Sequence, residues 1–197
     1  MNAYELITTR RSTRRFQDKM PETDLIGQIV EAGRYAPSGG NNQTTHFFVI
    51  QKKELLEELA VLARDAFAKM EVTEGMYPSL RTSVTKSKEG NYVFHYNAPV
   101  LIVTANKKDY GNNIADCSCA LENIMIMANA LDLGSCWINQ LKWLNEDPDI
   151  LAVFRKLGLQ EDERIYGALA VGYADSTDGL PERKPLARKG NPVEWIR

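Results

Sequence analysis

The sequence predicts an α+β fold, and two observations indicate this class. Segments with apolar residues at helical spacing alternate along the chain with short, almost continuous apolar runs that are typical of strands. The 197 residues contain no repeat, no low-complexity tract and no linker that divides them. We therefore expect one domain over 1–197, in which 174–197 forms a C-terminal tail without core periodicity.

Five segments are predicted to be helices. Asn2 is a candidate cap for the first, Pro21–Asp24 opens the second, and Asp147 begins the last, with a proline in its first position. The helix at 114–131 is apolar over much of its surface, which favours a place against a sheet or a partner subunit. We expect Gly134 to end that helix in the left-handed conformation. The helices are expected at 2–10, 21–33, 54–70, 114–131 and 147–158.

Four apolar runs are predicted to be strands. The run at 99–104 is continuous, as expected for a strand covered on both faces. The segment 36–45 is interpreted as a polar loop with glycines, and 71–96 as a mobile excursion because glycines and a proline interrupt its pattern. The strands are expected at 46–51, 99–104, 135–138 and 165–172.

Composition narrows the function class. The net charge of −2 argues against general nucleic-acid binding, and the longest apolar stretch, 98–105, is too short to span a bilayer. The N-terminus has no basic segment followed by an apolar core, so no signal peptide is expected. Three cysteines, an odd and sparse set, then predict reduced thiols in the cytoplasm. No membrane partner is expected.

Positive charge is concentrated at the end of the first predicted helix, in Arg10-Arg11-Ser12-Thr13-Arg14-Arg15-Phe16. Like charges this close repel one another unless an anion binds or the side chains extend into water. Guanidinium groups with a hydroxyl between them suit a phosphate. Cations are also favoured at a helix C-terminus, so a solvated helix end is the alternative.

Side chains for acid, base or metal chemistry are scarce. The chain has no Gly-x-Gly-x-x-Gly after a strand, no phosphate-binding Gly-x-x-x-x-Gly-Lys-Ser/Thr, no nucleophile elbow and no metal cluster. Its two histidines, His46 and His95, are expected to be structural. A bound organic cofactor is therefore the economical hypothesis for any chemistry, and no side chain need act as acid or base.

Two further segments offer contacts for a ligand. The loop at 36–43 combines small residues, which let the backbone approach a flat ligand, with hydroxyl and amide side chains. Taken alone it is also an ordinary turn cluster. The segment 180–185 is a basic island in the tail, and its alternative interpretation is a solvated terminus.

Taken together, these segments resemble the nitroreductase family of FMN-dependent oxidoreductases. The resemblance extends from 10 to 185 and rests on four motifs in a fixed order. The motifs are Arg-Arg-Ser-x-Arg-x-Phe at 10–16, Ala-Pro-Ser-x-x-Asn-x-Gln at 36–43, Gly-Ser-Cys-Trp-Ile at 134–138 and Pro-x-Arg-x-Pro at 181–185. The resemblance implies a mixed, mainly antiparallel sheet flanked by helices, in an intertwined homodimer with each FMN site at the subunit interface.

The resemblance also implies roles for individual residues. Arg10 and Ser12 hold the FMN phosphate together with Arg183 from the tail, Arg11 lies along the same wall, and Arg14 reaches the pyrimidine edge of the flavin. A second group comes from the other subunit and lies against the ring and ribityl chain. This group consists of Pro37, Ser38, Gly39, Asn41 and Asn42.

The resemblance further implies that Ile138, Asn139 and Gln140 run past the flavin, with a backbone N–H near flavin N5. Many members carry Glu-Gly or Gly-Gly where this chain has Asn139-Gln140, which is a departure from the family pattern. An asparagine that contacts the ring in the family has no matching position in 71–91.

The implied activity is transfer of a hydride from NADH or NADPH, by way of flavin N5, to a small electron-poor aromatic acceptor such as a nitroaromatic or a quinone. Donor and acceptor would use the same space in turn, in ping-pong order. Three alternatives stay open. They are a specialised flavin enzyme of the same fold (dehalogenase-like or flavin-destroying), a flavin-binding protein without turnover, and an unrelated phosphoanion-binding domain.

Overall fold

A four-stranded antiparallel sheet forms the centre of the computed structural model, which describes residues 1–197. The strands follow the order β1-β2-β4-β3, and all three pairings are antiparallel, which confirms the expected sheet type. One isolated parallel bridge joins Ser12 to Ser135 beside β3. The strands are β1 (His46–Ile50), β2 (Val100–Lys107), β3 (Gly134–Ile138) and β4 (Glu163–Gly172).

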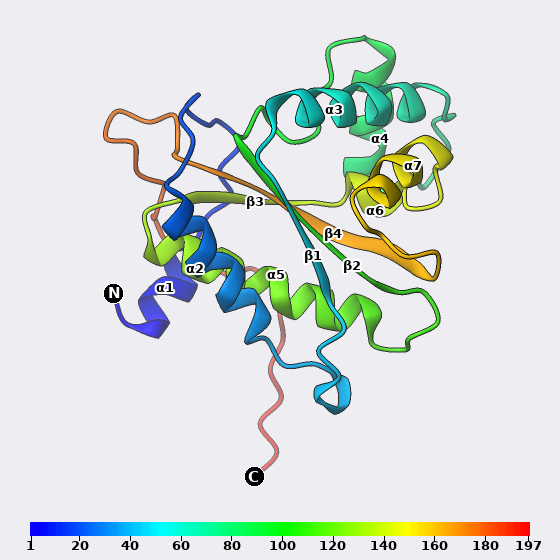
Figure 1. Ribbon diagram of the computed structural model, residues 1–197. Helices are drawn as coiled ribbons and strands as arrows, with labels where there is room; N and C mark the ends of the chain where they lie inside the picture. The colour runs from blue at the N-terminus through cyan, green and yellow to red at the C-terminus, as the bar shows by residue number, and fades with distance from the viewer.

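Helices cover both faces of this sheet (Figure 1). Helices α2 and α5 pack on one face, while α3, α4, α6 and α7 contribute to the larger apolar cluster on the other. None of the helices combines the length and hydropathy that a bilayer crossing requires. The helices are α1 (Ala3–Thr9), α2 (Thr23–Arg34), α3 (Lys53–Ala68), α4 (Pro78–Lys88), α5 (Asn113–Ala130), α6 (Gln140–Trp143) and α7 (Pro148–Lys156), with a short 3-10 helix, η1 (Gly39–Asn41).

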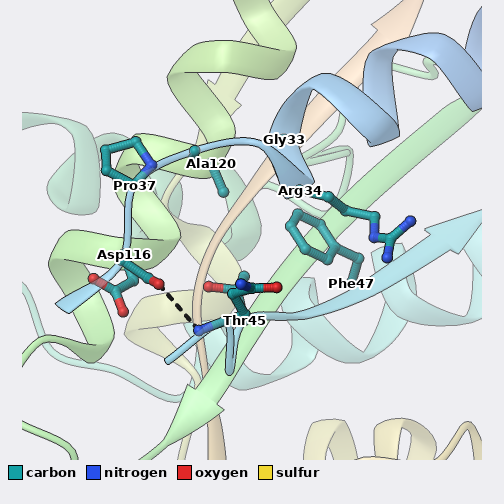
Figure 2. A pocket seen from close by; sticks show the side chains of 10 residues that line it. Gly33, Arg34, Pro37, Thr45, Phe47, Asp116 and Ala120 are labelled. Atoms are coloured by element: carbon teal, nitrogen blue, oxygen red, sulfur yellow. Dashed lines mark hydrogen bonds between the residues drawn. The ribbon is translucent and has the colours of Figure 1, made fainter. Parts of the chain in front are cut away.

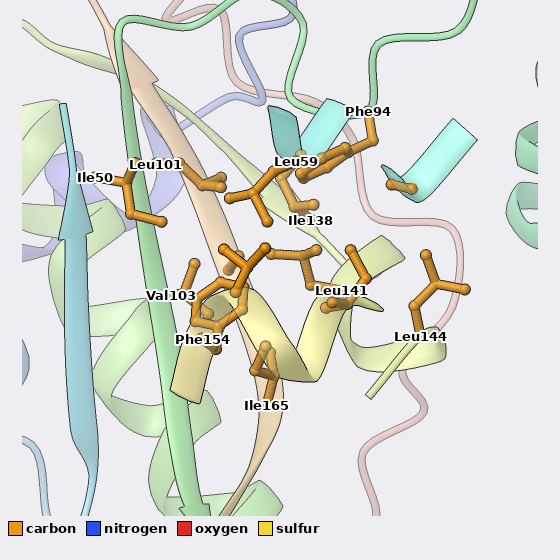
Figure 3. Close-up of a cluster of buried hydrophobic side chains, with 14 of the residues drawn as sticks. Ile50, Leu59, Phe94, Leu101, Val103, Ile138, Leu141, Leu144, Phe154 and Ile165 are labelled. Carbon is orange, nitrogen blue, oxygen red and sulfur yellow. The ribbon is translucent and has the colours of Figure 1, made fainter. Parts of the chain in front are cut away.

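Strand β2 separates the two apolar clusters. Leu101 and Val103 face the larger cluster, where Val103 lies near Phe154 in Figure 3, whereas Ile102 faces the cluster made with α2 and α5. Successive side chains of a strand point to opposite faces, so an apolar run without alternation requires cover on both sides. The expectation of a doubly covered strand at 99–104 is confirmed.

Local capping residues set two of the expected helix starts. The Asn2 side chain accepts a hydrogen bond from the Glu5 backbone at 2.9 Å, and the Glu5 carboxylate accepts one from the Asn2 backbone at 2.9 Å. Asp147 accepts from the backbone N–H groups of Asp149 and Ile150 at the start of α7. Both starts satisfy N–H groups that a helix leaves without internal partners.

The segment 71–96 differs from the sequence prediction. It contains α4, and Val84 and Phe94 from this segment belong to the larger apolar cluster. The helix was hidden because two of its three buried residues are serines, Ser83 and Ser87, which leave no apolar stripe in the sequence. The four-residue helix α6 was also not predicted.

The expected role of Gly134 as a helix stop is wrong. Asp132 takes the left-handed conformation after α5, with φ 62°, and Leu133 donates to the Ala128 carbonyl at 2.9 Å. Gly134 instead begins β3, and glycine is required there because a side chain would clash with a neighbouring residue. A Cβ atom there would lie 2.6 Å from Thr13 Oγ1 and 2.8 Å from Thr13 Cβ, so glycine permits a close approach.

Gly27 provides a direct test of the helix assignment for α2. It is an exposed interior position, and an added Cβ would meet no atom within 4 Å. Gly27→Ala is expected to raise the free energy of unfolding by about 0.5–1 kcal/mol because alanine loses less conformational entropy in a helix. Urea denaturation measures the change. A decrease would show that another chain covers this face of α2.

Candidate functional site

The arginine-rich segment 10–16 lies along the edge of the sheet, next to β3. The Thr13 backbone N–H donates to the Ser135 carbonyl at 2.9 Å, and Phe16 forms an isolated bridge with Ala174. These two contacts hold the segment at its middle and at its C-terminal end. The anchored backbone therefore fixes where the arginine side chains begin.

Three of the predicted residues gather on one side of this segment. Ser12, Arg10 and Arg14 all lie near the Cys136 thiol, where each lowers the pKa of that thiol. Burial has the larger, opposite effect and raises the pKa of Cys136 overall, so the thiol stays neutral. Alternate residues of an extended segment share a face, which explains why these three positions come together.

Arg10 has an incomplete set of partners. Its Nη1 atom is buried and forms no hydrogen bond, and the Nε atom lies 4.0 Å from the nearest carboxylate oxygen, on Glu122. The side chain as a whole is 25% exposed. An unpartnered buried donor is unfavourable by roughly 1–3 kcal/mol, and more when it is charged. The position is therefore suited to an anion that approaches from solvent.

The tail reaches the same end of the protein. Arg11 Nε donates to the Lys184 carbonyl at 2.7 Å, and Arg183 Nε donates to Asn129 Oδ1 at 3.1 Å. Asn129 in turn donates to the Leu6 carbonyl at 3.0 Å, so one side chain links the tail to α1. Arg11 and Arg183 are thus brought beside the start of the arginine-rich segment from opposite ends of the chain.

The guanidinium group of Arg183 is only partly used by these contacts. Its Nη2 atom donates to the Asn129 carbonyl and to Asp132 Oδ1, the latter at 2.7 Å. Nη1 takes part in no hydrogen bond. The Arg183 position therefore combines an anchoring role with one free donor, which sequence reasoning did not anticipate.

The predicted loop group lies at the opposite end of α5. The Gly39 backbone donates to Asp116 Oδ1 at 3.1 Å, and Tyr110 donates to the Gly39 carbonyl at 3.1 Å. Pro37 and Ser38 border a small cavity of about 120 Å³ that Asp116 also lines (Figure 2). The remaining loop residues are exposed, Asn41 with φ 55° and Asn42 with its side chain near the Tyr110 hydroxyl at 3.5 Å.

The length of α5 separates the loop group from the anchor of Arg183 within one chain. Asp116, which holds the loop, is in the first turn, and Asn129, which holds Arg183, is in the last. Thirteen residues of α-helix span about 20 Å. Arg10 lies between these two ends, because its Nε atom is 4.0 Å from Glu122 Oε1 in the middle of the helix.

The third predicted group follows β3. Ile138 is 1% exposed and its side chain belongs to the larger apolar cluster, so only its backbone is available for a ligand. Asn139 accepts a hydrogen bond from Trp137 Nε1 at 2.8 Å. Gln140 Nε2 donates to the Tyr92 hydroxyl at 2.7 Å and to Ser83 Oγ at 3.2 Å. The two bonds of Gln140 connect the residues after β3 to α4 and to the segment that follows α4.

A second cavity is bordered by Arg14 and by residues that the sequence did not reveal. Its volume is about 480 Å³, and we call it the Tyr92 cavity. Tyr96 and Asn97 have left-handed backbone conformations, φ 57° and 55°, which are uncommon for residues other than glycine and occur often at functional sites. The residues that line the Tyr92 cavity are Arg14, Arg15, Phe16, Lys86, Asn91, Tyr92, Val93, Tyr96, Asn97 and Asp175.

The histidines lie outside this arrangement. His46 Nδ1, at the start of β1, is 2.9 Å from Glu163 Oε2, at the start of β4, across the end of β2. Burial lowers the pKa of His95 to about 4, so its ring is neutral near pH 7. Burial also raises the pKa of the Cys117 thiol to about 12, which leaves it protonated and unreactive.

Comparison with known proteins shows similarity of sequence and of fold. A model of the nitroreductase family matches residues 7–173. A nitroreductase with bound FMN from Bacteroides fragilis has 33% sequence identity and a TM-score of 0.85, with all of both chains covered. A nitroreductase with bound FMN from Desulfitobacterium hafniense has 26% identity and a TM-score of 0.80, covering 98% of this chain and 100% of that one.

One characterised name also occurs among the relatives. A nitrobenzene nitroreductase from Ectopseudomonas oleovorans is 26% identical over 213 residues, which covers 91% of this chain and 89% of that protein. The similarity therefore spans nearly the full length of both proteins, and the fold matches that of nitroreductases.

Proposed function

Because this chain belongs to the nitroreductase family, we propose that it is an FMN-dependent oxidoreductase that uses NADH or NADPH to reduce a small electron-poor aromatic acceptor, a nitroaromatic or a quinone. The observation that carries this proposal is the unpartnered Nη1 of Arg10, which is buried beside Ser12 and near Arg14. A phosphate would supply the missing acceptor for that atom.

The residues present fit FMN at its phosphate end. Arg10 offers a buried donor, Ser12 an exposed hydroxyl, and Arg183 a free Nη1. Arg11 has its Nε and Nη2 atoms engaged by the Lys184 and Thr8 carbonyls, so its part is to hold the tail along the same wall.

The ring would lie toward the Tyr92 cavity. Arg14 would place a cation at the pyrimidine edge, and the backbone of Ile138, Asn139 and Gln140 would run past the ring, held by the bond from Gln140 to Tyr92. When bound, FMN supplies the redox chemistry, accepting a hydride from the nicotinamide and passing the electrons to the acceptor. The protein's contribution is position, charge and exclusion of water.

We further propose a homodimer in which a second copy supplies Pro37, Ser38, Gly39, Asn41 and Asn42 to each site. The separation of about 20 Å along α5 between Asp116, which holds this loop, and Asn129, which holds Arg183, supports that arrangement. So does α1, which has no buried residue and exposes Tyr4 and Ile7. Three free cysteines suit a reducing compartment, which supports a cytoplasmic location.

An absorbance spectrum of the purified protein, followed by anaerobic titration with NADH and with NADPH, tests the proposal. We expect a yellow protein that bleaches with at least one donor and regains colour with nitrobenzene or a quinone. Protein that neither carries nor binds added FMN would contradict the cofactor assignment. Protein that binds FMN but is bleached by neither donor would support the alternative of a flavin-binding protein without turnover.

Arg183 provides a separate test of the phosphate assignment. Arg183→Ala is expected to weaken FMN binding by about five- to tenfold, because it removes a partly shielded charged donor. A fluorescence titration of FMN into the apo-protein measures the change. Arg188→Ala is the matched control, since Arg188 is exposed in the same tail and is expected to leave the affinity unchanged. Equal affinities for Arg183→Ala and the parent protein would leave the tail a solvated terminus.

A further inference from the structure

The residues that border the Tyr92 cavity carry a net positive charge. Three cations border it, Arg14, Arg15 and Lys86, against one carboxylate, Asp175. Arg15 is paired with Asp175 at 2.9 Å, which neutralises both. The chain as a whole has a net charge of −2, so this surplus is not a consequence of composition.

The two remaining cations have no partners. Neither Arg14 nor Lys86 forms a hydrogen bond to another side chain or an ion pair within 4.0 Å. Lys86 lies in the last turn of α4, where the helix dipole favours a cation. Lys88 lies in the same turn and is paired with Glu71 at 3.8 Å, outside the cavity. Lys86 is thus the unpaired lysine of this turn and the one that borders the cavity.

Aromatic side chains form the other walls. Tyr92, Tyr96 and Phe16 all line the cavity, and their rings present flat apolar surfaces to its contents. The volume of about 480 Å³ is within the usual range for small-molecule pockets. Aromatic walls combined with unpaired cations favour an aromatic molecule that carries a negative charge.

We propose that the acceptor reduced by this protein is an aromatic anion, such as a nitrobenzoate, and that Lys86 selects it by pairing with the carboxylate. This inference rests on the proposed function, in which Arg14 and the flavin ring take one side of the Tyr92 cavity and the space bordered by Lys86 is left for the acceptor. A nitro group takes two electrons and one proton as hydride from the donor and a second proton from solvent, and releases water as it becomes a nitroso group. The carboxylate stays ionised throughout and serves recognition alone.

The test compares two acceptors that differ in charge and little in shape, 4-nitrobenzoate and 4-nitrobenzamide. The FMN-loaded dimer is assayed at saturating NADH or NADPH, and kcat/KM is obtained for each acceptor. Lys86→Gln is expected to lower the ratio of nitrobenzoate to nitrobenzamide values by about five- to tenfold, as a unit charge at close range implies. Lys88→Gln, the matched control, is expected to leave the ratio unchanged. Added salt is expected to lower kcat/KM for nitrobenzoate in the parent protein and to leave it unchanged in Lys86→Gln.

A binding measurement without turnover accompanies the assay. Benzoate and benzamide are titrated into the oxidised FMN-loaded protein, and the change in flavin absorbance gives each Kd. Lys86→Gln is expected to weaken benzoate binding about five- to tenfold and to leave benzamide binding unchanged. An equal loss for both compounds, or a change confined to the KM of the nicotinamide donor, would overturn the proposal, because Lys86 would then act on the cofactor or the donor.

These outcomes separate the inference from the function on which it rests. If neither acceptor is reduced by protein that binds FMN, the proposed activity fails, and the benzoate titration still decides whether Lys86 recognises an aromatic anion. If both acceptors are reduced with the same ratio in the parent protein and in Lys86→Gln, the activity stands and the inference fails.

Discussion

Arg10→Ala is expected to weaken FMN binding by about ten- to a hundredfold, which corresponds to a charge-assisted hydrogen bond of about 1.5–3 kcal/mol. The buried Nη1 of Arg10 has no partner in the chain, so its contribution is realised when a phosphate binds. Fluorescence titration of FMN into the apo-protein measures the loss. An unchanged dissociation constant would contradict the assignment of Arg10 to the phosphate.

The same substitution is expected to act differently on the apo-protein. Alanine removes an unsatisfied buried donor and reduces repulsion within the arginine-rich segment, whereas the ion pair that is lost, at 4.0 Å to the 48% exposed Glu122, is weak. Thermal unfolding without FMN should therefore be unchanged or slightly raised. This combination of lost affinity and kept stability distinguishes a binding residue from a structural one.

Arg155→Ala is the control for both measurements. Arg155 lies on α7 and is paired with Glu161 at 2.7 Å, away from the proposed site. We expect no change in FMN affinity. If Arg155→Ala lowered the affinity as much as Arg10→Ala, the effect would be one of overall charge and would argue against a specific phosphate contact.

Local signals predicted most of the fold. The cap at Asn2, the proline after Asp147 and the continuous run in β2 each specify structure through neighbouring residues, and each prediction is confirmed. Helix α4 could not be found in this way. Ser83 is buried because it bonds with Tyr92 and with Gln140, and Gln140 is close in space but distant in sequence.

The candidate site divides in a similar way. Arg10, Ser12 and Arg14 share a side because alternate positions of one extended segment do so, which the motif spacing already implies. Lys86 and Tyr92 carried no signal, since only the packing of α4 over the end of β3 brings them to Arg14. The separation of the loop at 37–42 from Arg183 was equally hidden, because it depends on how α5 lies between their anchors, Asp116 and Asn129.

Gly134→Ala is expected to destabilise the protein by about 1–3 kcal/mol and to weaken FMN binding with it. The new Cβ of residue 134 would lie 2.6–2.8 Å from three atoms of Thr13. One of them is the Cβ atom of Thr13, which cannot move unless the Thr13 backbone moves too. Thr13 donates from its backbone to Ser135, so relief of the clash would shift the segment that carries Arg10, Ser12 and Arg14. Urea denaturation and FMN titration measure the two effects.

Thr13→Gly should rescue Gly134→Ala, because it removes all three atoms that the new methyl group meets. In a double-mutant cycle, the variant that carries both Thr13→Gly and Gly134→Ala should be more stable than the sum of the two single effects predicts. It should also bind FMN more tightly than that sum predicts. Gly27→Ala, where an added Cβ meets nothing, controls for the general effect of replacing a glycine. If the double variant bound FMN no better than Gly134→Ala alone, the glycine would act on β3 itself, and the close approach of Thr13 would not be what positions the arginine-rich segment.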